Sequence, residues 1–342
     1  MTTTQPGPKN LITDVPGLRV GNAHDARAMT GATVILCDTR MVASVDMRGG
    51  APGTRETDAL TPETLVDAVD AIVLSGGSVY GLEAASGVAK WLGARGRGFK
   101  LGASNMVAPI VPAAILFDLM NGGDKNWGEH PPYDALGRAA CEAASENFAL
   151  GNAGAGYGAQ ADQLKGGLGS ASTQTDDGFI IGALAAVNPF GSVLVPGTRT
   201  FWAWPFERAH ELGGQTPPSQ PLPHLDFPDD IKARVPRPGE NTTIGVVAVN
   251  ARLSVAEARR VAMMAQDGYA RAIRPIHTMG DGDVVFALAS GTRELPEPRA
   301  LYLSRLGAIA ADTMARAVAR GVFEAKSLGN LVSYGDFAGP GR

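Results

Sequence analysis

The chain has 342 residues, of which 44 are glycine, 44% are hydrophobic and 19% are charged. This apolar content excludes an intrinsically disordered protein, and the glycines follow no Gly-X-Y period, which excludes collagen. The formal net charge of −4, with no long block of basic residues, argues against a nucleic-acid partner.

The cysteines and the hydropathy pattern indicate a reducing compartment. Cys37 and Cys141 are too few for a disulfide framework or a cysteine-based zinc site. The apolar runs stay below the ~18 residues of a membrane span, and the first ten residues do not resemble a secretory signal. We therefore expect a cytoplasmic protein that does not associate with membranes.

In chain order, the pattern first predicts short strands at 18–20, 32–36 and 41–45, and then a glycine loop at 48–53. A helix at 61–69, a strand at 71–74 and a small-residue helix at 79–92 are predicted next. Residues 106–120 fit a strand or a helix. Helices at 134–146, 254–273 and 305–320 and strands at 180–188, 192–195, 243–249 and 284–289 complete an α/β pattern.

Residues 212–240 differ from the rest of the chain because they hold seven of its 23 prolines. Such a segment is typical of an exposed connector arm. The arm ends at Asn241-Thr242-Thr243. Cleavage between Asn241 and Thr242 would give Thr242 a free α-amine beside its hydroxyl, which is the arrangement of an N-terminal nucleophile. A turn asparagine before β-branched strand residues explains the same letters.

A second cluster, His277 with Asp281 and Asp283, comes before the strand at 284–289. Two carboxylates so close can raise one another's pKa, and one of them could orient or deprotonate a nucleophile. A histidine with two aspartates also fits a metal-dependent hydrolase, although the ligand spacing is not a standard one. A solvated Asp-Gly turn is a third reading.

Glycine-rich segments at 75–81 and 154–159 leave another alternative open. The second matches the relaxed G-x-G-x-x-A pattern, so a non-catalytic nucleotide- or metabolite-binding protein is a rival hypothesis. That segment does not lie between a clear strand and a clear helix. Lys165 follows among further glycines, where burial would lower its pKa, although an exposed loop lysine is the commoner case.

Taken together and in this order, the segments resemble the DmpA-type aminopeptidases and the related nylon-oligomer (6-aminohexanoate-oligomer) hydrolases. The likeness covers nearly the whole chain except the arm and the termini, and is carried by residues 30–34, 48–50, 75–84, 154–169, 187–189, 241–245, 265–273 and 277–283. It implies a layered α-β-β-α sandwich formed by two fragments of an autocatalytically cleaved precursor, residues 1–241 and 242–342.

For the site, the resemblance implies that Thr242 is the nucleophile, exposed by cleavage after Asn241. It also implies that Asp281 and Asp283 lie beside Thr242, and that the same site receives two further side chains, Lys165 and Asn188.

Relatives carry a tyrosine where this chain has Phe117, and a phenyl ring cannot donate a hydrogen bond. Asn188 and backbone N–H groups would then stabilise the oxyanion. We expect Tyr80 and Phe117 to contact the substrate.

These observations lead to one hypothesis, a self-processing amidohydrolase or aminopeptidase that cleaves short peptides or oligoamides, with 6-aminohexanoate oligomers among the candidate substrates. It requires no metal or cofactor. The resemblance also implies a homo-oligomer, a tetramer or larger, of the processed fragments.

Overall fold

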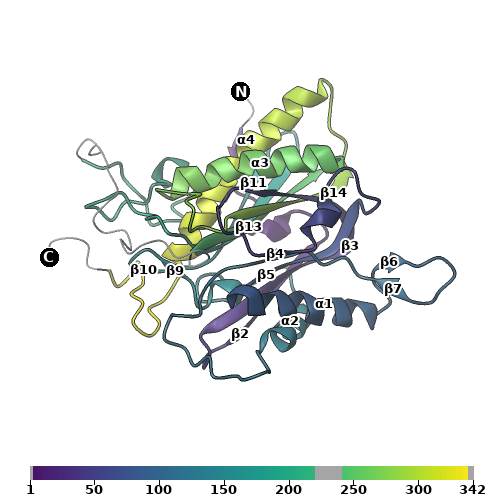
Figure 1. Cartoon of the computed structure of the whole chain (residues 1–342). Coiled ribbons are helices and arrows are strands. Elements are labelled where there is room, and N and C mark those ends of the chain that lie inside the picture. Colours follow the sequence, from purple (N-terminus) through teal and green to yellow (C-terminus); the bar gives the residue numbers. More distant parts are fainter. Residues whose placement is uncertain (1–2, 220–240, 338–342) are drawn as a thin grey trace.

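The computed structural model describes residues 3–219 and 241–337, which form four α-helices and one large sheet (Figure 1). The helices are α1 (Glu83–Gly93), α2 (Tyr133–Glu142), α3 (Val255–Ala272) and α4 (Arg299–Phe323). The longer strands are β2 (Leu18–Asp25), β3 (Thr30–Met47), β5 (Ala68–Ser75), β11 (Gly167–Thr175), β12 (Ile180–Asn188), β13 (Thr242–Ala251) and β14 (Val284–Arg293). The short strands are β1 (Thr4–Gln5), β4 (Thr54–Arg55), β6 (Phe99–Lys100), β7 (Val107–Ala108), β8 (Ala113–Ile115), β9 (Gln160–Ala161) and β10 (Leu164–Lys165), and the 3-10 helices are η1 (Ile12–Asp14), η2 (Thr57–Leu60), η3 (Ser78–Leu82), η4 (Gly154–Gly156) and η5 (Trp204–Phe206).

The long strand β3 joins two halves of the sheet. The strand order is β1-β11-β12-β13-β14-β3-β5-β8-β4, and β2 also pairs with β3. Residues 42–47 of β3 pair with β14, whereas residues 30–37 pair with β2. The pairing with β5 shifts register between Leu36 and Met41. The 18 residues of β3 therefore run from one half of the sheet into the other.

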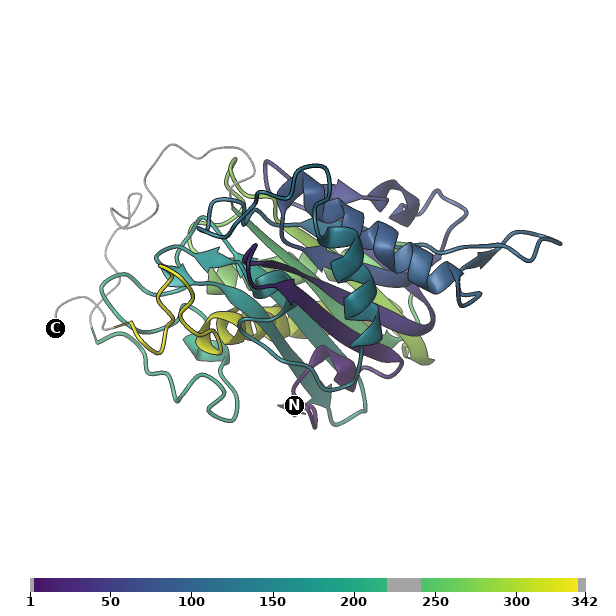
Figure 2. The ribbon, with the colours of Figure 1, turned by 90° about the horizontal axis from the view of Figure 1, so that it is seen from below.

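Three hydrophobic cores separate four layers. Alternate residues of β13 face opposite cores: Val247 packs with α3 and α4, and Val246 packs with Ile35 and Leu74 from the other half of the sheet. Val34 and other residues on the far side of that half pack against α1 and α2. In Figure 2, which views the molecule from below, α1 and α2 lie in front of the strands. The α-β-β-α layering implied by the resemblance is confirmed.

Local signals in the sequence account for several elements. At the start of α3, the Ser254 hydroxyl accepts a hydrogen bond from the Glu257 N–H at 3.3 Å, and the Glu257 carboxylate accepts from the Ser254 N–H at 2.8 Å. This capping box fixes the helix start as predicted. The strand at 180–188 has the predicted bounds, and residues 106–120 hold the strands β7 and β8.

Other predictions were wrong. The helix at 61–69 is absent: η2 occupies Thr57–Leu60, the Thr64 hydroxyl bonds back to the Ala59 carbonyl in a turn, and β5 begins at Ala68. Thr64 is one of the residue types whose side chain competes with the helical backbone. Residues 192–195 make only isolated bridges, and the strands at 32–36 and 41–45 are parts of one strand, β3. Most of the predicted arm, residues 220–240, lies outside the described residues. In the part of the chain that is described, none of the helices has the length and apolar character needed to cross a membrane.

Candidate active site

Thr242 lies at the first position of β13, at the edge where β12 ends and β14 begins. Asn188, the last residue of β12, is its direct antiparallel partner. The parallel register of Ile244 with Val284 places the segment before β14 on the other side. Opposed residues in neighbouring strands carry side chains within a few ångströms of each other. The sheet thus brings residues 188, 242 and 281–283 together from three distant parts of the sequence.

Strand alternation distinguishes the two adjacent threonines. Thr243 pairs with Val187, which belongs to the core under α3 and α4, so its side chain faces those helices. The Thr243 hydroxyl is buried and has no hydrogen-bond partner among the described residues. Thr242 faces the opposite way, and a Cβ added at Gly282 would lie 2.8 Å from its Oγ1. Of the two threonines, Thr242 is therefore the one that faces the loop at residues 281–283.

The Asn241 carbonyl, which belongs to the peptide bond before Thr242, is held by two donors. The Thr242 hydroxyl donates a hydrogen bond to the Asn241 oxygen, and the Gly282 N–H donates to the same oxygen at 3.0 Å. A hydroxyl next to a carbonyl whose oxygen also accepts a backbone N–H is an arrangement that suits acyl transfer. Asn241 and Thr242 are both at most 3% exposed.

Both aspartates position backbone rather than touch the threonine hydroxyl. Asp281 accepts from the Phe190 N–H at 3.1 Å and from the hydroxyl and N–H of Thr278 at 2.6 and 2.9 Å. Asp283 accepts from the Thr243 N–H at 2.8 Å and from the His277 ring nitrogen at 2.9 Å. Burial and the negative charge of Asp283 raise the pKa of Asp281. Among the described residues, neither carboxylate forms a hydrogen bond with the Thr242 hydroxyl.

His277 does not join the aspartates at a common centre, because its ring contacts Asp283 while Asp281 is bound to the Thr278 turn. In residues 3–219 and 241–337, no group of three His, Cys, Asp or Glu side chains is arranged to hold a metal ion.

Asn188 is oriented by two backbone groups. Its Oδ1 accepts from the Gln160 N–H at 2.8 Å, and its Nδ2 donates to the Phe117 carbonyl at 3.1 Å. The backbone carbonyl of Phe117 therefore adjoins the site through Asn188.

Lys165 is fully buried beside this group. It pairs with Gln160 across β9 and β10, and its Nζ donates to the carbonyls of Gly156 and Gly166 at 2.9 and 2.8 Å. Burial lowers its pKa to about 7, although the negative charge of Asp118 opposes the change. The structure thus places Lys165 one hydrogen-bonded residue away from Asn188, and its charge changes near neutral pH.

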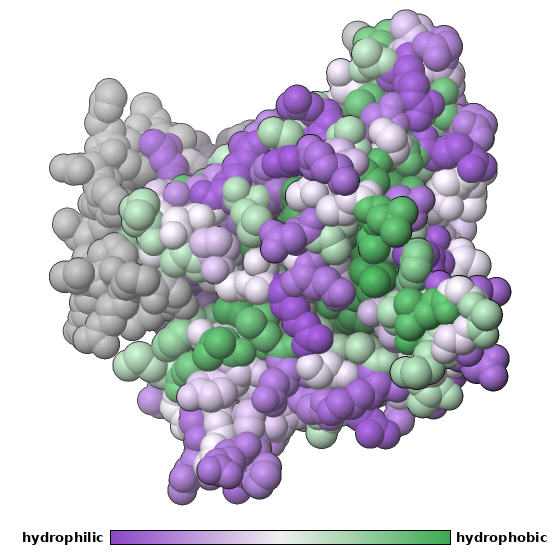
Figure 3. All heavy atoms as spheres, turned by 45° about the vertical axis from the view of Figure 1, so that its right-hand side comes forward, coloured by the Kyte–Doolittle hydropathy of each residue, from purple (hydrophilic) through white to green (hydrophobic). Residues whose placement is uncertain are grey.

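Three exposed apolar side chains, those of Tyr80, Met279 and Val332, belong to segments that adjoin the site, and we call them its apolar rim. Tyr80 in η3 is 47% exposed and packs edge-on against Trp127 at 5.7 Å. Met279, in the turn before Asp281, and Val332, whose carbonyl accepts from the Lys165 N–H, are also exposed. On the face shown in Figure 3, hydrophobic patches lie among polar residues.

The glycine-rich segments serve close packing. The 154–159 segment contains η4 and does not follow a strand directly, so it lacks the strand-turn-helix context of a dinucleotide site. A Cβ at Gly156 would lie 2.0 Å from the Leu168 backbone nitrogen. The loop at Gly77 contacts Asp118, a buried residue that no sequence pattern marked, just as none marked the Gly282 N–H.

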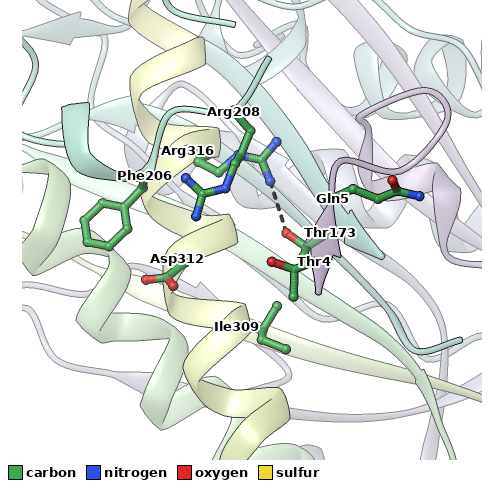
Figure 4. Close-up of a pocket in the computed structure, with 8 residues that line it drawn as sticks. All are labelled: Thr4, Gln5, Thr173, Phe206, Arg208, Ile309, Asp312 and Arg316. Atoms are coloured by element: carbon green, nitrogen blue, oxygen red, sulfur yellow. Dashed lines mark hydrogen bonds between the residues drawn. The ribbon is translucent and has the colours of Figure 1, made fainter. Parts of the chain in front are cut away.

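A separate surface pocket lies between β1, η5 and α4 (Figure 4). None of the predicted site residues lines it. One of its lining residues, Arg316, donates to Thr173 at 3.1 Å and to Glu211 at 2.5 Å. This pocket therefore marks a structural ion pair and not the catalytic centre.

Comparisons with known proteins show the family to which the chain is related. The model of a family described as peptidase family S58 matches residues 10–332. An uncharacterized aminopeptidase of Mycobacterium tuberculosis is 43% identical over 96% of this chain and 97% of its own length. A 6-aminohexanoate-oligomer endohydrolase of Agromyces sp. is 32% identical over 91% of this chain and 86% of its own length.

Two solved structures show the fold. A β-aminopeptidase of Burkholderia sp. is similar with a TM-score of 0.68 and 22% identity, over 97% of this chain and 92% of the other. The L-aminopeptidase D-Ala-esterase/amidase of Ochrobactrum anthropi, described as a variant of the Ntn hydrolase fold, has a TM-score of 0.68 and 20% identity over the same shares. The sandwich found here is thus of the Ntn-hydrolase type.

Proposed function

This chain belongs to peptidase family S58, and from that membership we propose that it is a self-processing enzyme whose nucleophile is Thr242. It is a hydrolase of amide bonds, in line with relatives named as an aminopeptidase and as an oligomer endohydrolase. The observation that carries the proposal is the contact of the Thr242 hydroxyl with the Asn241 carbonyl, whose oxygen also accepts the Gly282 N–H.

In the maturation step, Thr242 Oγ1 attacks the Asn241 carbonyl carbon. The hydroxyl proton leaves, the negative charge on the Asn241 oxygen is stabilised by the Gly282 N–H, and the C–N bond breaks as the Thr242 nitrogen takes up a proton. Water then hydrolyses the resulting ester. The products are residues 1–241, ending in a carboxylate, and residues 242–342, beginning with a free amine.

In turnover, a substrate carbonyl takes the place that the Asn241 carbonyl occupies before cleavage. The Gly282 N–H is then available to its oxyanion, and the Asn188 amide lies next to Thr242 on the neighbouring strand. The free α-amine of Thr242 accepts the hydroxyl proton and returns it to the leaving amine. Water releases the acyl group.

Asp281, Asp283 and Lys165 support these steps without direct contact with the hydroxyl. The aspartates hold the backbone on either side of Thr242 through Thr243 and Phe190. Because the pKa of Lys165 is about 7, its protonation determines the charge next to Asn188.

We assign to this site the amide bonds of short peptides or of 6-aminohexanoate oligomers, with Tyr80, Met279 and the Phe117 ring contacting the apolar parts of the substrate. The exposed apolar rim supports this assignment. We further propose that the processed enzyme works in the cytoplasm as a homo-oligomer.

Intact-mass measurement tests the maturation step. Purified wild-type protein is expected to give fragments of 241 and 101 residues, with Thr at the N-terminus of the smaller. Thr242→Ala should remain a single chain without activity on p-nitroanilides or aminohexanoate oligomers, whereas Thr242→Ser should retain cleavage. Thr243→Val is the matched control, because that side chain faces the other core. An active wild-type preparation of full-length chain, or an active Thr242→Ala variant, contradicts the proposal.

A further inference from the structure

We propose that Asp118 is a positioning residue of this active site: its carboxylate, enclosed by the two glycine-rich loops, fixes the Phe117 carbonyl to which Asn188 donates and supplies the negative charge that acts on Lys165. This inference rests on the proposed function, since it concerns how the same site is held and charged.

The Asp118 side chain is buried and fully anchored. It is 2% exposed. Oδ2 accepts from the Thr30 hydroxyl at 2.6 Å, and Oδ1 accepts from the Gly77 N–H at 2.8 Å. The Thr30 oxygen in turn accepts from the Tyr133 hydroxyl at 3.2 Å. A buried carboxylate held by two donors cannot reorient without losing both bonds.

The glycines around Asp118 explain why two separate glycine-rich segments converge here. A Cβ at Gly76 would lie 2.1 Å from Asp118 Oδ2, and a Cβ at Gly158 would lie 2.7 Å from the same atom. Both contacts are too short for any side chain. The glycines of both loops therefore leave room for the Asp118 carboxylate.

Asp118 is connected to Thr242 through one peptide unit and the side chain of Asn188. The Phe117 carbonyl immediately precedes the Asp118 backbone nitrogen, and this carbonyl accepts from Asn188 Nδ2 at 3.1 Å. Asn188 is the strand partner of Thr242. Fixing Asp118 thus fixes the acceptor that orients the Asn188 amide beside Thr242.

The charge of Asp118 acts on a lysine that otherwise contacts neutral carbonyls. The Lys165 ammonium donates to Gly156 and Gly166, and Asp118 is the charged group that raises its pKa against burial. Burial in turn raises the pKa of Asp118 to about 6, while the Thr30 hydroxyl and the charge of Lys125 lower it. Tyr133 also faces this cluster, through its hydrogen bond to Thr30. Removing the carboxylate charge favours the neutral amine of Lys165, so its titration should move toward acid.

The test is Asp118→Asn, which keeps the size of the side chain and removes its charge. In protein labelled with 13C at lysine Cε, the NMR titration midpoint of Lys165, assigned with Lys165→Met, should fall by about one pH unit or more. The pH profile of p-nitroanilide hydrolysis should move in the same direction, so that rates at a fixed pH on the sloping limb change about tenfold. Asp70→Asn is the control, because Asp70 is also buried and bonded to a backbone N–H, at Ile110, outside the site.

A second variant covers the case in which Asp118→Asn does not fold. Thr30→Val preserves shape and removes the hydroxyl donor to Asp118, so the carboxyl is protonated at a higher pH and the Lys165 midpoint falls as well. An unchanged midpoint in the folded variants, or a moved midpoint with an unchanged rate profile, overturns the inference. Activity of Thr242→Ala would instead overturn the proposed function, while the NMR midpoint still reports on Asp118 and Lys165.

Discussion

Adding a single methyl group at Gly282 should slow maturation and catalysis while the chain still folds. A Cβ at this residue would lie 2.8 Å from Thr242 Oγ1 and 2.7 Å from the Ala51 carbonyl oxygen. Its backbone φ lies outside the left-handed region, so alanine meets no backbone strain there. Gly282→Ala also retains the N–H that donates to the Asn241 oxygen. The effect is therefore one of crowding at the nucleophile.

The size of the effect follows from the displacement. Ordinary contact begins at 3.4 Å, so Thr242 Oγ1 has to retreat by about 0.6 Å from the added methyl. A misplacement of about 1 Å can cost about 100-fold in rate, so we expect maturation to be about 10- to 100-fold slower. The accompanying loss of stability should stay near 1–3 kcal/mol, the usual cost of overpacking.

Time-resolved intact mass after rapid purification measures the conversion to fragments, and urea denaturation measures the loss of stability. Gly93→Ala is the control: its Cβ meets only the Pro109 ring, at 3.8 Å, far from the site. If Gly282→Ala matures and hydrolyses substrate at the wild-type rate, the placement of Thr242 against the 281–283 loop is incorrect.

Three further predictions concern groups around the site and the core. Glu211→Gln removes the charge that pairs with the buried Arg316 and should lower the free energy of unfolding by about 3–5 kcal/mol. Urea denaturation in the single-chain Thr242→Ala background measures this loss, and an unchanged free energy of unfolding would refute the pairing. Thr243→Val replaces a buried hydroxyl that lacks a partner among the described residues, so the same assay should show equal or greater stability, and a loss would contradict its position. Burial lowers the pKa of Lys165 from 10.5 to about 7, so the unfolded chain binds more protons than the folded chain between these pH values. The free energy of unfolding should therefore rise with pH across this window relative to Lys165→Met. Parallel curves for the two proteins would contradict the burial of Lys165.

Much of the fold could be predicted from local pattern. The capping box of α3 and the apolar runs of β12, β13 and β14 carry signals that tertiary packing does not override. The stretch at 61–69 failed because the start signal at Thr61 belongs to a turn that leads straight into a buried strand. A start signal without a following helical period is weak.

The site could be predicted only in part. The order of segments indicated Thr242 and its neighbours, but which of the two threonines faces the reacting carbonyl depends on the sheet. Strands buried on both faces read as continuous apolar runs, so the sequence of β13 carries no polar face from which to deduce side-chain direction. Asp118 was missed because its importance comes from loops at 76–77 and 158 that are distant in sequence. The Gly282 N–H is a backbone group and leaves no mark in the residue letters beyond permitting a glycine.

The strand order has a consequence for the two fragments that the proposed cleavage after Asn241 would produce. β13 and β14 lie side by side in the interior of the sheet, with β12 on one flank and β3 on the other. A cut ahead of Thr242 leaves both flanking ladders intact, from Ile181 to Asn188 on one side and from Val42 to Met47 on the other. The smaller fragment cannot dissociate as a docked subunit would. Its dissociation would break the pairing of β13 with β12 and the pairing of β14 with β3. Dilution should not separate the pieces, and their exchange between molecules should be as slow as global unfolding.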